Sequence, residues 1–197
     1  MKNISVLLFL LITLALNAQN NKTSGLNARQ FHKYWKVESE SPDYKVTFLG
    51  DTVEILSPKG LTLWRKEKMS GKVTIEYDAC VVVEVEGDRL SDLNCFWMAS
   101  DPQYPDNIWK REKWRSGIFL NCYSLQLYYM GYGGNHNSTT RFRRYDGNEA
   151  AITNAKARPA ILKEYTDADH LLEANKWYHI KITNENNRVS YYINGVR

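Results

Sequence analysis

The chain has 197 residues, of which 43% are hydrophobic, so it is long enough to bury one sizeable core and too short for two ordinary domains. Its formal net charge of +4 is modest and its acidic residues are spread along the chain, which excludes the clustered basic surface of a nucleic-acid binder. Six Trp and thirteen Tyr provide flat apolar faces with a polar edge, which suit interfaces and sugar rings as well as a β-sandwich core.

The N-terminal segment has the layout of a cleavable secretory signal. Lys2 precedes an apolar run from Val6 to Leu16, which ends at Asn17-Ala18-Gln19. The run is short for a membrane span, and no cysteine follows it to mark an acylated lipoprotein. We therefore predict a signal peptide over residues 1–19, a lead-in over 20–43 and a secreted or periplasmic domain over 44–197.

From about residue 44 onward, apolar and polar residues alternate with a period of two between Gly, Asp and Asn turns. This pattern predicts an all-β domain of antiparallel strands, with residues 150–174 forming a covering loop or a short helix near 170–174. The predicted strands are 44–49, 52–57, 61–65, 72–86, 94–99, 117–122, 124–131, 139–145, 177–183 and 188–194.

Side chains alternate between the two faces of a strand, so the sequence also predicts faces. In the last hairpin the core face is expected to carry one alternating set: Tyr178, Ile180, Ile182, Val189, Tyr191 and Ile193.

In strand 139–145, Arg141, Arg143 and Tyr145 share a face, and Phe142 points the other way as the anchor to the core. Gln126 and Tyr128, from the preceding strand, are expected to join the arginine face.

Three cysteines stand inside apolar, strand-like runs: Cys80, Cys95 and Cys122. Their odd number, wide spacing and lack of a Cys-x-x-Cys pair make a zinc site improbable and allow at most one internal disulfide. We expect buried free thiols, no metal and no cofactor.

Residues 132–147 read Tyr-Gly-Gly-Asn-His-Asn-Ser-Thr-Thr-Arg-Phe-Arg-Arg-Tyr-Asp-Gly and crowd hydrogen-bond donors and acceptors and three guanidinium groups beside a glycine turn. Guanidinium groups pair with carboxylates in bidentate fashion, so Arg141, Arg143 and Arg144 indicate a site for an acidic or hydroxyl-rich ligand. An exposed basic strand is the plain alternative.

Two other features join this stretch in a family resemblance: Phe96-Trp-Met-Ala-Ser-Asp-Pro, and the hairpin from Trp177-Tyr-His-Ile-Lys-Ile-Thr to Tyr191-Tyr-Ile-Asn-Gly. Residues 28–197 thereby resemble concanavalin A-like lectin and glucanase domains, and a bacterial family of exported domains of unknown function linked to polysaccharide degradation. The resemblance implies a two-sheet antiparallel jelly roll that holds carbohydrate on its concave face. Such domains continue beyond the Asn-Gly turn, so the resemblance also implies that the last strand or strands are missing.

A polysaccharide lyase is the first of three function classes that these residues allow. It needs a cation for the uronate carboxylate and a group that moves the neighbouring proton. Arg141 and Arg143 are candidates for the first role, with Asn135 and Asn137 as hydrogen-bonding partners of the sugar. The candidates for proton transfer are His136, Tyr132 and Tyr145.

A noncatalytic binding module and a glycoside hydrolase are the two alternatives. The loop 106–115 contributes Trp109 and Trp114, which suit sugar stacking or packing against the sandwich. A hydrolase needs two carboxyl groups, and Asp101 is the candidate from the Ala-Ser-Asp-Pro motif. We expect an exported domain that acts on a uronate-containing polysaccharide or oligosaccharide by β-elimination, with no nucleic-acid partner and no membrane span.

Overall fold

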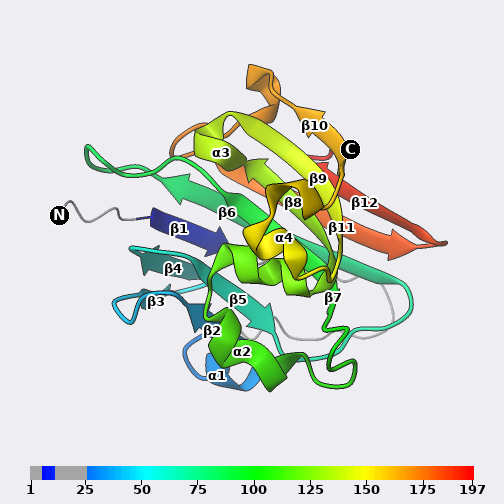
Figure 1. Cartoon of the computed structure of the whole chain (residues 1–197). Helices are drawn as coiled ribbons and strands as arrows, with labels where there is room; N and C mark the ends of the chain where they lie inside the picture. The colour runs from blue at the N-terminus through cyan, green and yellow to red at the C-terminus, as the bar shows by residue number, and fades with distance from the viewer. Residues whose placement is uncertain (1–5, 12–25) are drawn as a thin grey trace.

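The computed structural model describes residues 6–11 and 26–197 (Figure 1). The chain is mainly β-structure, with 44% strand against 19% helix, and the strand pairs are antiparallel. The all-β prediction is therefore confirmed in this coarse form.

The larger sheet has six strands in the order β12-β11-β6-β1-β4-β3. Their bounds are β1 Val6–Leu11, β3 Lys45–Leu49, β4 Thr52–Ser57, β6 Val73–Val82, β11 Trp177–Glu185 and β12 Arg188–Ile193.

The second sheet has four strands in the order β10-β9-β8-β7, and a two-stranded sheet pairs β2 with β5. The bounds are β7 Leu93–Ser100, β8 Gln126–Gly133, β9 Thr139–Asp146, β10 Ile161–Tyr165, β2 Trp35–Ser39 and β5 Leu61–Arg65.

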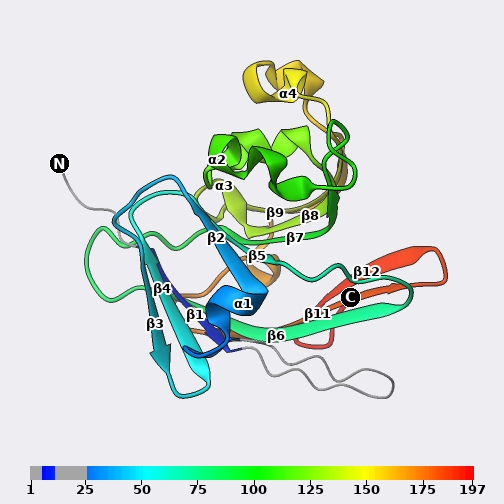
Figure 2. The same cartoon turned by 90° about the horizontal axis from the view of Figure 1, so that it is seen from below.

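Short helices complete the chain, and in Figure 2 most of them lie beyond the four-stranded sheet, on the side away from the six-stranded one. The α-helices are α1 Phe31–Tyr34, α2 Glu112–Arg115, α3 Gly134–Asn137 and α4 Ala150–Thr153. The 3-10 helices are η1 Ile108–Arg111, η2 Phe119–Ser124, η3 Ala155–Ala157 and η4 Ala168–His170.

The core between the two larger sheets is built from the inward faces of β6, β11, β7 and β9. Trp97 stacks on Phe142, with ring centroids 5.9 Å apart, and on Tyr191 at 6.1 Å. Tyr178, Ile180, Ile182 and Tyr191 are buried here, with Val189 and Ile193 packed against them, so the predicted core face of the last hairpin is confirmed. Phe142 anchors β9 as predicted.

A second apolar cluster lies on the opposite face of the four-stranded sheet. Leu127, Tyr129 and Tyr145 pack there with Tyr123 of η2 and Ala151 of α4. The helical layer therefore covers part of this face, and Figure 1 shows α3 at the other end of the sheet from α2.

Residues 117–122 were predicted as a strand, and this prediction is wrong. Ser116 and Gly117 have positive φ values of 45° and 71°, and the chain then enters η2. Asn121 donates to the Trp114 carbonyl at 3.0 Å, and Ser124 donates to the Asn121 carbonyl at 2.7 Å. These local hydrogen bonds compete with a strand ladder.

The sequence pattern also missed β2 and β10, which are five-residue strands at sheet edges. Residues 6–11 of the predicted signal peptide form β1, between β4 and β6. All three cysteines are free, with Cys80 and Cys122 buried and Cys95 half-buried. In the part of the chain that the structure describes, no helix is long and apolar enough to cross a bilayer.

A buried ion pair joins β2 to α2. The Arg115 guanidinium donates to both carboxylate oxygens of Glu38, at 2.6 and 3.1 Å, and to the Ile108 carbonyl at 2.8 Å. Both charged side chains are almost fully removed from water. Burial raises the pKa of Glu38 from its ordinary value, and Arg115 opposes that shift.

Glu38→Ala should lower the free energy of unfolding by about 3–5 kcal/mol, because it leaves the Arg115 charge buried without its partner. Urea unfolding measures the loss. The matched control is Glu40→Ala, whose pair with Lys59 is exposed and should matter by less than about 1 kcal/mol. Equal stabilities of the two variants would show that the Glu38–Arg115 pair does not hold β2 in place.

Removal of residues 1–19 should lower the melting temperature by more than about 5 °C, because β4 and β6 both lose the strand that pairs with them. Thermal unfolding of the two forms, with N-terminal sequencing of the exported protein, is the measurement. An unchanged melting temperature would mean that the sheet does not depend on β1.

Candidate functional site

The face of the four-stranded sheet that points away from the six-stranded sheet forms part of a large open groove. The cross-strand register sets two neighbouring rows on this face. The first row is Asn94, Gly131, Arg141 and Glu164, and the second contains Phe96, Tyr129 and Arg143. The groove lining includes members of both rows together with the α3 loop. Amide, phenol and guanidinium groups thus meet on one surface.

Tyr129 lies across Gly131 in the centre of this face. A Cβ atom at position 131 would stand 2.1 Å from the Tyr129 hydroxyl, so only glycine leaves room for the ring. The hydroxyl donates a hydrogen bond to Asn94 Oδ1 at 3.0 Å. Gly131 pairs with Arg141 on its other side, so the phenol lies over Gly131, between the Asn94 and Arg141 positions of the row.

Burial is the main reason that the pKa of Tyr129 is well above its ordinary value, and the charge of Asp92 adds to the shift. The positive charges of Arg143 and Arg141 oppose it. The phenol is therefore protonated at neutral pH, and its proton is donated to Asn94 Oδ1.

Arg141 and Arg143 share the groove face but have different partners. Arg141 Nε donates to Glu164 Oε1 at 2.5 Å, which balances its charge. Arg143 donates to the Pro159 carbonyl, a neutral acceptor, so its positive charge remains. Both side chains are half-buried, and each guanidinium has further N–H groups for a ligand.

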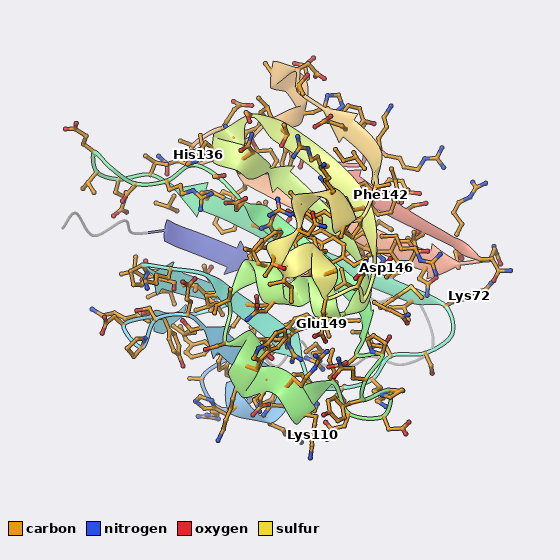
Figure 3. All side chains as sticks on the ribbon, in the orientation of Figure 1. Lys72, Lys110, His136, Phe142, Asp146 and Glu149 are labelled. Carbon is orange, nitrogen blue, oxygen red and sulfur yellow. The ribbon has the colours of Figure 1, made fainter. Side chains whose placement is uncertain are left out.

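The α3 loop holds His136 at the Arg141 end of β9 (Figure 3). Asn135, His136 and Asn137 all have positive φ values, of 52°, 58° and 56°. Three left-handed residues in a row are costly for side chains other than glycine. His136 is exposed at the turn and lines the groove.

Hydrogen bonds from Asn137 hold this strained loop in place. Its side-chain amide donates to the Leu172 carbonyl and accepts from the Leu172 N–H, both at 2.8 Å. The Asn137 backbone N–H donates to Ser91 Oγ at 3.4 Å, and Ser91 in turn donates to the Gly133 carbonyl at 2.9 Å. Asn137 therefore positions His136, and its side chain is not available for the sugar contact that the sequence suggested.

Aromatic side chains line the other end of the groove. Trp109 and Phe119 are half-buried there, and Phe96 and Tyr123 pack with them in the second apolar cluster. Arg158 lies over the Tyr123 ring at 5.7 Å. Apolar faces next to hydrogen-bonding groups suit pyranose rings.

Two tyrosines predicted for proton transfer are core residues. Tyr132 is buried between the sheets, and its hydroxyl donates to the Leu171 carbonyl at 3.0 Å. Tyr145 lines the groove but is only 1% exposed, packed against Tyr123 and Tyr129. Burial raises the pKa of both phenols, which makes them poor bases.

The prediction that Asp101 is a catalytic carboxylate does not fit the structure. Its side chain is fully buried and receives two hydrogen bonds from Arg111, both at 2.8 Å. Arg111 also contacts Glu149 of the neighbouring loop. Asp101 therefore ties loop 101–111 to α4 and has no access to a substrate.

Three predicted ligand contacts lie on the core face of the sheet rather than on the groove face: Gln126, Tyr128 and Arg144. Tyr128 pairs with Arg144, and Gln126 pairs with Asp146, so these residues share the face of Phe142 rather than that of Arg143. Tyr128 stacks on Phe142 at 5.9 Å, and Arg144 lies over the Tyr128 ring.

The remaining predicted residues divide between groove and surface. Asn135 is exposed in the α3 loop, lines the groove and donates to Ser138 Oγ at 3.0 Å. Trp109 lines the groove, whereas Trp114 is 44% exposed on α2 beneath the Arg111 guanidinium.

Sequence reasoning missed Tyr129, Asn94 and Gly131. The available signal was Gly131 itself, because a glycine inside an apolar strand marks a close approach by another group. The correct partner strand could not be known without the register. Among the described residues, no group of three or more His, Cys, Asp or Glu side chains is arranged to hold a metal ion.

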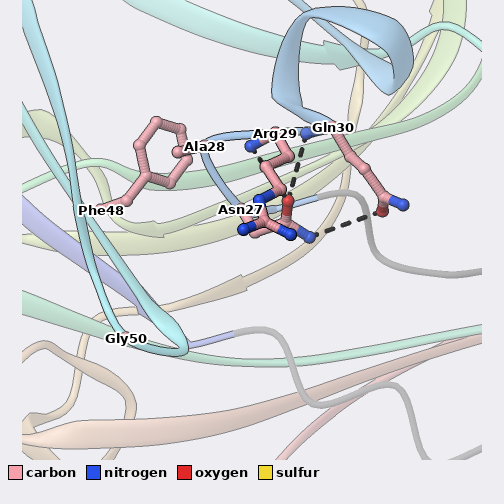
Figure 4. Close-up of a pocket in the computed structure, with 6 residues that line it drawn as sticks. All are labelled: Asn27, Ala28, Arg29, Gln30, Phe48 and Gly50. Carbon is pink, nitrogen blue, oxygen red and sulfur yellow. Dashed lines mark hydrogen bonds between the residues drawn. The ribbon is translucent and has the colours of Figure 1, made fainter.

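A second pocket lies near the start of the described chain (Figure 4) and is formed by residues 27–30 with Phe48 and Gly50. Asn27 Oδ1 accepts hydrogen bonds from the Arg29 and Gln30 backbone N–H groups at 3.2 and 3.1 Å. The Asn27 side-chain oxygen is thus already hydrogen-bonded within the turn.

A family model for a domain of unknown function, DUF6250, matches residues 55–197. The chain belongs to DUF6250. The matched range includes β6 to β12 and therefore both rows of the groove. No curated protein and no solved structure matches the chain. The chemistry of this DUF6250 chain therefore has to follow from the residues that line the groove.

Gly131→Ala should lower the free energy of unfolding by about 1–3 kcal/mol, because the new methyl group collides with the Tyr129 ring and breaks its hydrogen bond to Asn94. Urea unfolding is the measurement. In a Tyr129→Ala background the same substitution should cost much less, since the colliding ring is gone. An equal cost in both backgrounds would contradict the contact.

Proposed function

We propose that this DUF6250 chain is an exported enzyme that cleaves a uronate-containing polysaccharide or oligosaccharide by β-elimination. The observation that carries the proposal is the Tyr129 phenol, which donates to Asn94 and lies over Gly131, the neighbour of Arg141 in the same row, with Arg143 in the next row. The antiparallel pairing of all described strands supports the further proposal that the two larger sheets form a jelly roll of the concanavalin A-like type.

The elimination needs three groups, and the groove contains a candidate for each. Arg143 donates to the neutral Pro159 carbonyl, which leaves its positive charge unbalanced there, and we assign it to the uronate carboxylate. His136 is the candidate base that removes the proton next to that carboxylate. The electron pair forms a carbon–carbon double bond as the neighbouring carbon–oxygen bond breaks.

Tyr129 is the candidate acid in this scheme. It gives its proton to the leaving glycosidic oxygen, and the proton that His136 has taken returns to Tyr129 through water before the next turnover. Burial raises the pKa of the phenol, so Tyr129 enters the reaction protonated.

Binding without catalysis is the second candidate function. The aromatic end of the groove favours it, because Trp109, Phe119 and Phe96 would hold sugar rings without any proton transfer. A hydrolase is less favoured, since Asp101 is buried in an ion pair and Asp92 is paired with Arg89.

The test is digestion of acidic and neutral polysaccharides, followed by the ultraviolet absorbance of unsaturated uronates and by release of reducing ends. An increase in both signals is expected. Reducing ends without the absorbance would indicate a hydrolase, and binding without either signal would indicate a binding module.

Arg143→Ala should lower kcat/KM by at least about 100-fold, because the developing charge on the substrate loses its cation. His136→Gln and Tyr129→Phe should each lower kcat by about 100-fold or more. The matched control is Arg144→Ala, the neighbouring arginine on the opposite face, which should change kcat/KM less than about twofold. Equal losses in Arg143→Ala and Arg144→Ala would remove the carboxylate site from the proposal.

A further inference from the structure

The two groove arginines differ in a way that the proposed function does not use. Arg141 donates to a carboxylate of the same chain, Glu164, across the β9–β10 pair. Arg143 donates to a backbone carbonyl. A uronate carboxylate and the Glu164 carboxylate are the same chemical group, and Arg141 binds one of them already.

Glu164 lies on an exposed edge strand that has fewer contacts to its sheet than the central strands have. β10 is the outer strand of its sheet, its register with β9 shifts between Ile161 and Lys163, and four of its five residues are exposed. Edge strands with irregular pairing have fewer contacts to break than central ones. Strand β9, which contains Arg141, is held on both sides and anchored by Phe142.

The ion pair itself is weak enough to exchange. The Arg141 and Glu164 side chains are 33% and 35% exposed, so water screens the attraction between them. An anion that arrives from the groove can therefore replace Glu164 on the guanidinium without unfolding the sheet.

We propose that Glu164 is an internal competitor for the anion site at Arg141, which lowers the affinity of the groove for acidic ligands and sets how strongly it distinguishes them from neutral ones. That the natural ligand is a uronate rests on the function proposed above. The competition at Arg141 applies to any anion. Arg143 then provides a permanent cationic contact and Arg141 a contact that becomes available when Glu164 leaves.

The test compares the wild-type full chain with Glu164→Gln in titrations with an oligogalacturonate and with its methyl ester, which lacks the charge. Glu164→Gln should tighten binding of the oligogalacturonate about two- to fivefold and leave the methyl ester unchanged. The control variant is Glu173→Gln, which removes an exposed carboxylate paired with Lys176 and should change neither affinity. In an Arg141→Ala background, Glu164→Gln should give no gain.

Equal oligogalacturonate affinity of wild type and Glu164→Gln, or an equal gain for the methyl ester, would overturn the proposal. A parallel titration with inorganic sulfate tests the competition at Arg141 independently of the proposed uronate function. If neither protein binds oligogalacturonate but Glu164→Gln binds sulfate more tightly than wild type, the competition stands and the uronate function fails. If sulfate binding is also unchanged, the competition fails as well.

Discussion

Phe142 determines which way the central strand of the site faces. Its ring lies almost parallel to those of Trp97 and Tyr128, at interplanar angles of 9° and 13°, in the core between the sheets. Side chains alternate along a strand, so the residues on either side of Phe142 must point into the groove. A shift of one residue in the pairing of β9 would bury two guanidinium groups and expose the anchor, which explains why one register is strongly favoured.

The position of the hydroxyl group, rather than burial, separates the tyrosines of the groove region, since all three are buried. Tyr132 and Tyr145 are part of the two apolar clusters and contribute packing. Tyr129 packs in the same cluster as Tyr145, yet its hydroxyl reaches over Gly131 to Asn94 on the adjacent strand, because position 131 has no side chain. The backbone of one glycine therefore converts a packing residue into a candidate functional one.

The sequence predicted the regular part of this fold well, because alternation is a local signal. The last hairpin and the anchor residue Phe142 follow from a period of two alone. The sequence did not show which residues of β8 share a face with Arg141 and Arg143 of β9. That depends on the register, that is, on which residue of one strand lies opposite which residue of the other. That register pairs Tyr129, rather than Tyr128, with Arg143.

Polar residues were harder to assign than apolar ones. Asp101 was expected to be a catalytic carboxylate because of the Ala-Ser-Asp-Pro motif, and Asn137 was expected to contact the sugar because of its place in the polar loop. Both side chains are in fact hydrogen-bonded within the protein. Asp101 accepts from Arg111, and Asn137 donates to the Leu172 carbonyl of another loop. Motif chemistry alone does not show whether a polar group is already satisfied within the protein.

The contact between Tyr129 and Gly131 also links two positions in evolution. A relative with a side chain at position 131 has no space for a tyrosine ring lying across it, so position 129 must then be small or must point elsewhere. Presence of both Gly131 and Tyr129 would accordingly mark members of DUF6250 that retain the phenol in the groove, and their joint loss would mark members whose groove serves a different chemistry.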